Sequence, residues 1–156
     1  MPSPSLLSTV LATMVLVGAF TMGSQPGIAA MPPALYRLGL PAAAGAVSVT
    51  VSSAELSPDP QDGQMLRLVV RYTIKNISDE PVPAVDFPLI RLLDPSGGTH
   101  EPAETRADDP ALSAGRLDPG AEVGETATFR VATDHFSSAT WLLLVGGPHG
   151  PRVTLQ

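Results

Sequence analysis

The residues from Met65 to Asn76 alternate strictly between inward apolar and outward side chains. The inward set is Leu66, Leu68, Val70, Tyr72 and Ile74, and the outward set is Arg67, Val69, Arg71, Thr73 and Lys75. Successive side chains of a β-strand point to opposite faces, so this pattern predicts a strand with one face in a core and the other in water. A helix would repeat every 3.6 residues instead. The chain therefore contains a sheet with one solvated face.

The same period of two recurs elsewhere between turn signals. It is found at residues 47–52, 126–131 and 151–156, whereas residues 85–94 and 141–145 are apolar runs typical of buried strands. Pro88 lies within the run 85–94 and removes a ladder donor, so we expect an edge strand or a bulge there. Residues 57–63 contain two prolines and a glycine and are expected to form a loop, as are residues 102–121.

The turn Asp-Pro-Ser-Gly-Gly at 94–98 also predicts a short returning strand at residues 99–101. With it the segments amount to about seven short strands, with no convincing helical period, in residues 46–156. The sequence therefore predicts an all-β fold, an immunoglobulin-like β-sandwich of about seven short antiparallel strands. Aromatic residues make up only 4% of the chain, so we expect a core of Val and Leu. The single Trp141 is expected to pack between the sheets as part of that core, not to serve as a ligand platform.

The first thirty residues carry no charged side chain. Leu6 to Met22 form a mostly apolar run that is followed by Gly, Pro and small residues, as in a signal peptide, and we expect cleavage after Ala30 and a secreted or periplasmic protein. The segment before the run lacks Lys and Arg, so an uncleaved membrane anchor or a buried helix stays an alternative. Residues 31–45 have the Pro/Ala-rich composition of a linker, which places the domain at 46–156.

Charge and cysteine content exclude several classes of function. Nine basic and fifteen acidic residues give a net charge of −6, which argues against binding to a nucleic acid backbone. Without any cysteine the chain has no disulfide, no thiol nucleophile, no thiolate zinc site and no lipid-acceptor Cys. We therefore expect no nucleic acid partner, and membrane contact only if the apolar run is uncleaved.

Two groups of residues have the composition of catalytic sites. Asp134 and His135 with Ser137 or Ser138 contain the types of a nucleophilic triad, but neighbouring positions of a strand point apart and no Gly-x-Ser-x-Gly turn is present. Asp108 and Asp109 could share a proton, but a loop of small polar residues favours solvated carboxylates. We expect no enzymatic activity and no catalytic residues.

The sequence motifs for metal binding and for N-glycosylation are incomplete or have a structural explanation. His100, His135 and His149 lie far apart, without ligand spacing. Asp59 and Asp62 could offer loop carboxylates to calcium, although the EF-hand pattern is missing. We expect no metal and no cofactor. Asn76 begins an Asn-Ile-Ser triplet that we interpret as the end of a strand, not as a glycan acceptor.

Four motifs in order resemble a known family: LRLVVRYTIKNISDEPV (66–82), LIRLLDPSG (89–97), LDPG (117–120) followed by TFRV (128–131), and the late WLLLV (141–145). Over residues 47–156 they are similar to the secreted bacterial immunoglobulin-like domains of unknown function related to the mycobacterial immunoprotective extracellular antigen. The resemblance implies an exported β-sandwich and no catalytic residues. Thr99 and His100 depart from it, because an aromatic residue commonly follows the Gly turn.

Together these features predict an exported, non-enzymatic module that binds an unknown protein or cell-envelope component. Because sandwich loops cluster at the two ends of the fold, we expect the long segment 102–121 to make contact. The alternative is a structural envelope protein that an uncleaved N-terminal helix tethers to the membrane.

Overall fold

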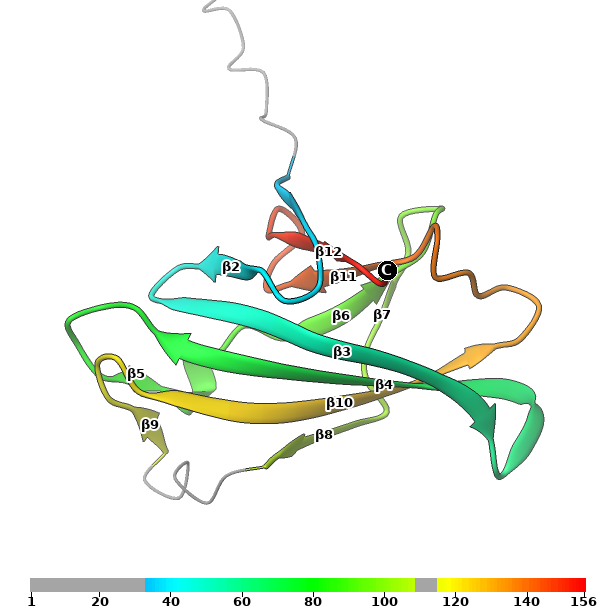
Figure 1. Cartoon of the computed structure of the whole chain (residues 1–156), viewed down its shortest axis with the longest axis horizontal. Coiled ribbons are helices and arrows are strands. Elements are labelled where there is room, and N and C mark those ends of the chain that lie inside the picture. Colours follow the sequence, from blue (N-terminus) through cyan, green and yellow to red (C-terminus); the bar gives the residue numbers. More distant parts are fainter. Residues whose placement is uncertain (1–32, 109–114) are drawn as a thin grey trace, which may run out of the picture. The chain divides into compact units, whose positions relative to one another are not determined.

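The computed structural model of this chain describes residues 33–108 and 115–156, which form two five-stranded sheets and a small two-stranded sheet (Figure 1). The first sheet has the order β2 (Pro41–Ala44), β3 (Val47–Asp59), β4 (Asp62–Asn76), β10 (Glu122–Ala132), β8 (Glu104–Ala107). The second sheet has the order β1 (Leu35–Tyr36), β12 (Arg152–Thr154), β11 (Leu142–Val145), β6 (Ile90–Leu93), β7 (Thr99–His100). The short strands β5 (Val82–Pro83) and β9 (Arg116–Leu117) pair with each other. This arrangement confirms the predicted all-β sandwich.

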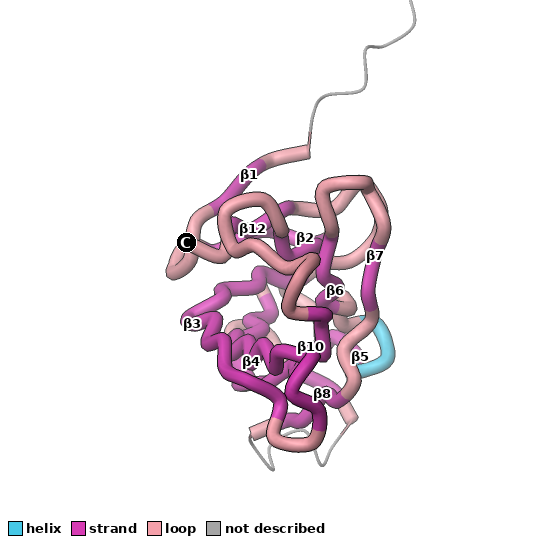
Figure 2. The backbone as a smooth tube through the Cα atoms, turned by 90° about the vertical axis from the view of Figure 1, so that its right-hand side faces the viewer, coloured by secondary structure: helices cyan, strands magenta, loops and turns pink. Residues whose placement is uncertain are grey.

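Strands β3, β4 and β10 form the longest antiparallel ladders of the fold. β10 pairs with β4 without interruption from Glu122 opposite Lys75 to Ala132 opposite Met65. The predicted alternation in β4 is confirmed, because Leu68, Val70, Tyr72 and Ile74 are buried while Arg67, Arg71 and Lys75 are exposed. The buried face points toward the second sheet, which lies on the other side of the core in the view turned by 90° (Figure 2).

The core contains side chains from both sheets and is aliphatic with few aromatic rings, as the composition predicts. The largest fully buried side chains are Phe129, Leu68, Ile74, Leu92, Leu143, Val47, Val49, Val51, Val70, Val123, Val145 and Val153. Burying one side chain of this size contributes about 1.5–3 kcal/mol to stability. Phe129 of β10 provides the largest of these surfaces, and Trp141 also belongs to the core.

The predicted linker at 31–45 is wrong over its described part, because residues 33–45 contribute two strands. β1 pairs in parallel with β12, and β2 pairs antiparallel with β3. Ala42 is fully buried, since its small side chain fits beneath this edge. Pro41 is the first residue of an edge strand, a position at which a missing N–H costs no ladder hydrogen bond. A Pro/Ala-rich composition is therefore compatible with an edge strand as well as with a linker.

The loop predicted at 57–63 is also wrong, because β3 continues to Asp59 and β4 starts at Asp62. Beyond Val51 no strand of the first sheet pairs with the outer side of β3, so Pro58 can occupy a free edge. The register shifts between Pro58 and Asp59, and the turn itself is only Pro60 and Gln61. The two strands thus form one long hairpin.

Two further segments differ from their predictions. Residues 85–94 do not form one strand: a 3-10 helix η1 spans Ala84–Asp86, and β6 begins only at Ile90, because proline at 88 cannot donate to a ladder. The expected loop 102–121 contains β8 and β9, which are too short to produce a periodic pattern in the sequence. With these pieces the described residues contain twelve strands instead of about seven, and β1 is parallel to its neighbour.

The predicted signal peptide lies outside the described residues. The part of the chain that the structure describes has no helix with the length and hydrophobicity of a bilayer span.

Candidate functional site

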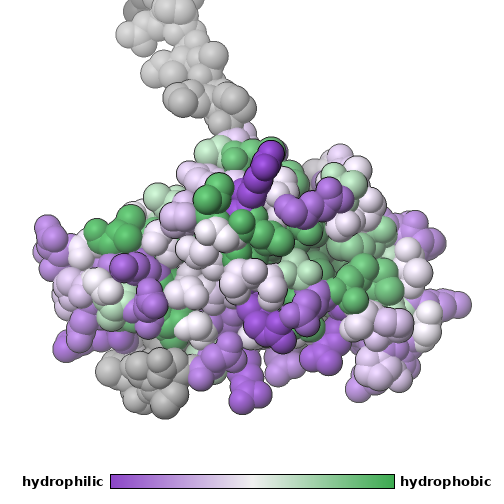
Figure 3. Space-filling model, in the orientation of Figure 1, coloured by the Kyte–Doolittle hydropathy of each residue, from purple (hydrophilic) through white to green (hydrophobic). Residues whose placement is uncertain are grey.

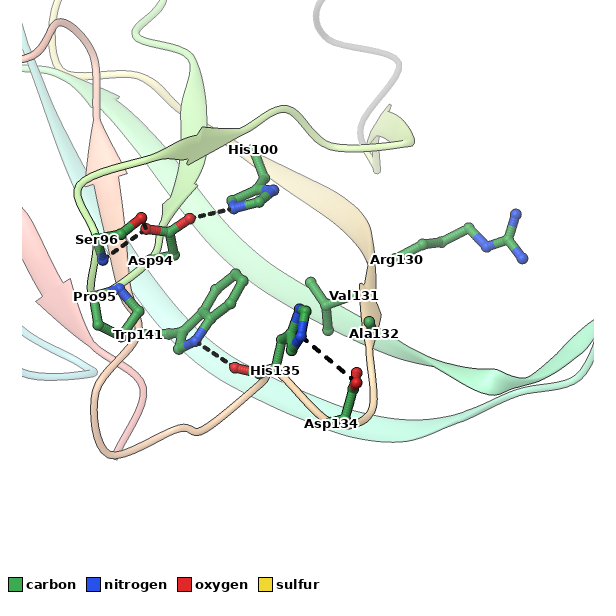
Figure 4. Close-up of a pocket in the computed structure, with 10 residues that line it drawn as sticks. All are labelled: Asp94, Pro95, Ser96, His100, Arg130, Val131, Ala132, Asp134, His135 and Trp141. Atoms are coloured by element: carbon green, nitrogen blue, oxygen red, sulfur yellow. Dashed lines mark hydrogen bonds and ion pairs between the residues drawn. The ribbon is translucent and has the colours of Figure 1, made fainter.

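A pocket of about 540 Å³ opens at the end of the sandwich where the β6–β7 turn, the end of β10 and the segment 133–141 meet (Figure 4). The lining residues are Asp94, Pro95, Ser96, His100, Arg130, Val131, Ala132, Asp134, His135 and Trp141. Its volume is in the range of small-ligand sites, and its walls combine aromatic, aliphatic and titratable groups. It is therefore the candidate functional site.

Trp141 lies at the base of this pocket and belongs to the hydrophobic core. Its indole N–H donates to the carbonyl oxygen of His135 at 3.1 Å, so its polar atom is satisfied although the side chain is buried. The His100 ring stacks on it with centroids 5.0 Å apart, and Phe136 packs against it at 5.4 Å. These rings cover the indole, which confirms the prediction of a core residue.

Asp94 organises the β6–β7 turn and positions His100. Its Oδ1 accepts hydrogen bonds from the Ser96 hydroxyl (2.6 Å), the Ser96 N–H (2.9 Å) and the Gly98 N–H (2.9 Å). Its Oδ2 lies 2.9 Å from Nε2 of His100. The Ser96 hydroxyl, then His100 and the backbone of Gly98, lower the pKa of the Asp94 carboxyl. A carboxylate with this many donors stays ionised and is a poor general base.

The glycines of this turn are needed for that geometry. Gly97 has φ of +89°, in the region that favours glycine. A Cβ on Gly98 would lie 2.6 Å from Oδ2 of Asp94, so a larger residue would displace the carboxylate. The Asp-Pro-Ser-Gly-Gly sequence thus predicts the turn, but the role of Asp94 in holding His100 on Trp141 becomes visible only in the structure.

The residues considered for a triad do not form one. Nε2 of His135 lies 3.6 Å from Oδ2 of Asp134, and both side chains are largely exposed. The Ser138 hydroxyl accepts a hydrogen bond from Gln156 at 3.5 Å, and among the described residues neither Ser137 nor Ser138 bonds to His135. Asp134 and His135 do face the pocket, so they offer a charged rim for binding (Figure 4).

Arg130 links the pocket region to the β3–β4 hairpin through an ion pair with the buried Asp59. The Gln61 N–H, which donates to Asp59 at 2.8 Å, contributes most to lowering the pKa of Asp59, and Arg130 adds to it. Asp62 accepts from the Gln64 N–H at 3.0 Å. The carboxylates of Asp59 and Asp62 therefore stabilise the turn between β3 and β4. Within residues 33–108 and 115–156, no group of three or more His, Asp or Glu side chains is arranged to hold a metal ion.

Asn76 is a structural residue at the end of β4. Its side chain is only 1% exposed, and its amide N–H groups donate to the carbonyl oxygens of Glu80 (2.7 Å) and Leu117 (2.9 Å). Its Oδ1 accepts from the N–H of Ser78 at 2.9 Å and from the Ser78 hydroxyl at 2.8 Å. All polar atoms of the amide are thus engaged, which leaves no room for a glycan on this side chain.

The remaining candidates lie away from the pocket. Asp108 accepts a hydrogen bond from the Thr126 hydroxyl at 3.0 Å, while Asp109 lies outside the described residues. His149 is exposed in the turn before β12. The structure therefore brings together His100, His135 and Asp134 from the sequence candidates and adds Asp94 and Arg130.

Comparison with known sequences finds a distant relative that is itself uncharacterized. No protein-family model matches the sequence. Over 85 residues the chain is 27% identical to the uncharacterized protein YxkC of Bacillus subtilis; the match covers 49% of this chain, and the chain spans about half the length of that curated relative (47%).

Comparison with solved structures shows which fold the chain shares. An uncharacterized β-sandwich protein from Clostridium difficile 630 superposes with a TM-score of 0.56 at 14% identity, covering 78% of this chain and 91% of that protein. A conserved hypothetical protein from Bacillus anthracis gives 0.56 at 15% identity (75% and 94% covered), and the yjhA protein of Bacillus subtilis gives 0.52 at 14% (78% and 99%). The chain thus shares the β-sandwich fold of uncharacterized bacterial proteins.

Proposed function

We propose that this chain is an exported, non-enzymatic β-sandwich that binds a protein or cell-envelope component through the pocket above Trp141. The observation that carries the proposal is the state of the pocket's polar groups. Asp94 is committed to Ser96, Gly98 and His100, and Arg130 is committed to Asp59. Such groups hold a shape and a charge pattern, but they neither activate a nucleophile nor move a proton.

The pocket has the features of a preformed recognition site. Its floor is rigid, because the stacked rings of His100 and Trp141 are held by hydrogen bonds at both polar ends. Its rim is open to solvent, since the side chains of Asp134 and His135 are 79% and 76% exposed. A rigid floor lowers the entropic cost of binding, and an exposed polar rim supplies specificity.

Export is part of the proposal and rests on the charge-free residues 1–30. Under it the chain belongs with the secreted bacterial immunoglobulin-like domains related to the mycobacterial immunoprotective extracellular antigen. The fold shared with uncharacterized β-sandwich proteins is compatible with this membership. If residues 6–22 are instead recovered in the membrane fraction on the intact chain, the tethered alternative replaces free secretion.

Proximity labelling with the full chain in its native envelope tests the binding function. The pocket variant is the double change Asp134→Ala and His135→Ala, which removes exposed rim groups with little effect on stability. The control is Glu122→Ala with His149→Ala, an exposed acid and an exposed histidine elsewhere. We expect a reproducible partner that the pocket variant loses and the control keeps. No partner, or equal recovery by all three proteins, would refute binding through this pocket.

A further inference from the structure

A second cavity, of about 510 Å³, lies at the other end of the sandwich, beside the β2–β3 turn, β5 and η1. Its lining residues are Ala44, Gly45, Ala46, Val47, Ser78, Glu80, Pro81, Val82, Pro83 and Asp86, and we call it the β5 groove. Val47 pairs with Asn76 at one end of β4, whereas Ala132 of the first pocket pairs with Met65 at the other. Eleven residues of strand separate them by roughly 35 Å, so the two sites are distinct (Figure 1).

The wall of the β5 groove is held in place by the buried Asn76. This side chain bonds to Ser78 and to the carbonyl oxygen of Glu80, and the Ser78 hydroxyl, whose one proton serves either acceptor, lies 2.8 Å from Oδ1 of Asn76 and 2.9 Å from that carbonyl. Pro81 and Pro83 then restrict the backbone that follows. A connecting segment with this many constraints loses little conformational entropy when a ligand binds, so the groove is preformed.

Apolar surface gathers in and around this groove. Val47 and Val82 line it from the core, at 2% and 7% exposure. In the sequence, the segment 77–89, which supplies part of the groove wall, carries three large apolar side chains that are exposed to solvent: Ile77 (53%), Val85 (91%) and Leu89 (57%). Figure 3 shows hydrophobic side chains beside strongly hydrophilic ones at this left-hand end of the molecule. Within the groove itself, the accessible apolar surface comes from Ala46, Pro81 and Pro83, which are exposed and line one cavity.

The charge of the β5 groove has one sign. Glu80 and Asp86 are its only charged lining residues, both are exposed, and neither forms an ion pair with another described residue. The sequence from 76 to 90 adds Asp79 and contains no Lys or Arg. A cationic group entering the groove would therefore meet carboxylates that have no competing partner.

We propose that the β5 groove binds an extended segment of a partner protein in which an apolar side chain is flanked by Lys or Arg. The apolar side chain would pack against the exposed Ala46, Pro81 and Pro83, above the buried Val47 and Val82, and the basic groups would approach Glu80 and Asp86. The chemistry of the groove selects against acidic segments, because they would place like charges together. This inference concerns a different surface from the Trp141 pocket and stands or fails separately from the proposed function.

Fluorescence anisotropy of a labelled Gly-Lys-Leu-Lys-Gly peptide with the full chain tests this inference, with Gly-Glu-Leu-Glu-Gly as the acidic probe. We expect the basic peptide to bind at least about tenfold more tightly than the acidic one, and to weaken as salt is raised. The double change Glu80→Gln and Asp86→Asn should weaken binding of the basic peptide by about three- to tenfold, as expected for two exposed charge pairs.

Two further variants separate the groove from general attraction to an acidic protein. Glu104→Gln with Asp108→Asn removes the same charge from the first sheet and should leave binding unchanged. Ala46→Trp fills the groove from an exposed turn position and should abolish binding. Equal affinity for both peptides, or equal weakening by the two charge variants, would overturn the inference. The variant Asp134→Ala with His135→Ala should bind the peptide as wild type does. If the inference about the β5 groove fails, the proposal for the Trp141 pocket is therefore not affected.

Discussion

Asn76→Asp is the most informative single change in this molecule. It keeps the size of the side chain and keeps Oδ1 as the acceptor for Ser78, but it replaces the amide donor with an oxygen. That oxygen would face the carbonyl oxygens of Glu80 and Leu117, at the present distances of 2.7 and 2.9 Å. Three acceptors would then share a site that is 1% exposed.

The cost of this change can be bounded from both sides. Two lost hydrogen bonds, at about 1 kcal/mol each, set a lower limit near ~2 kcal/mol. The upper limit comes from protonation: an Asp with an ordinary pKa of ~3.9 can be neutralised at pH 7 for about 4 kcal/mol, and then donates to one of the two carbonyls. Adding about 1 kcal/mol for the other carbonyl gives ~5 kcal/mol. We expect a loss of about 3–5 kcal/mol at pH 7.

The pH dependence gives a second, independent signature. Burial and the two carbonyls raise the pKa of the new carboxyl in the folded state above its unfolded value. The folded variant then binds a proton more tightly than the unfolded chain does, so its deficit relative to wild type is smallest below about pH 4 and grows as the pH rises. A polar substitution that only loosened the local packing would lack this dependence.

Urea unfolding followed by Trp fluorescence measures both effects, because the chain has a single tryptophan and it is buried. For a unit of about 125 residues, 3–5 kcal/mol corresponds to a fall in Tm of roughly 10–20 °C. Gln64→Glu, the same amide-to-acid change at an exposed position, is the control and should lie within about 0.5 kcal/mol of wild type. A deficit below about 1 kcal/mol, or one that does not change with pH, would refute the role assigned to Asn76.

Three further outcomes are expected, two from the structure and one from the sequence of the first thirty residues. Asp94→Asn should destabilise the protein most above about pH 4 and approach wild type as the pH falls further, because the lowered pKa of Asp94 stabilises the fold only while the carboxyl is ionised; a constant difference from pH 2 to 7 in urea unfolding would contradict this. Phe129→Ala should cost about 3–5 kcal/mol, since the ring is 1% exposed at the centre of the core; a loss below about 1 kcal/mol would show that the sheets close over the gap. Intact mass of the exported protein should place its first residue at Met31, and a mass that includes residues 6–22 would contradict cleavage.

The long strands were predictable because their pattern is local. Val47, Val49 and Val51 in β3 and the alternating residues of β4 carry their period within a few neighbouring residues, and the structure buries those side chains. Most short strands were not predictable for the same reason. β1, β5 and β9 have two residues each, which is too few to show any period. β7 is equally short, but the turn before it predicted the returning strand at 99–101, and the structure confirms it at Thr99–His100. They exist because a neighbouring strand pairs with them.

The candidate site divides in a similar way. The Asp-Pro-Ser-Gly-Gly turn and the burial of Trp141 could be expected from composition and turn chemistry. The stacking of His100 on Trp141 joins residues 41 positions apart, and the ion pair of Arg130 with Asp59 spans 71 positions. No local pattern encodes such pairs, since they depend on how strands from the two sheets come together.

By itself the sequence determined the class of the fold, the inner faces of β3, β4 and β10, and a core of Val and Leu. These features depend on the hydrophobicity of each residue, which favours its transfer from water to the core whatever its distant neighbours are. Only the tertiary structure decided that residues 33–45 form edge strands, that Asp94 serves His100, and that Asn76 joins the end of β4 to β9. These roles come from hydrogen bonds between groups distant in sequence, for example Asn76 with the Leu117 carbonyl, and such bonds are defined only once both sheets are in place.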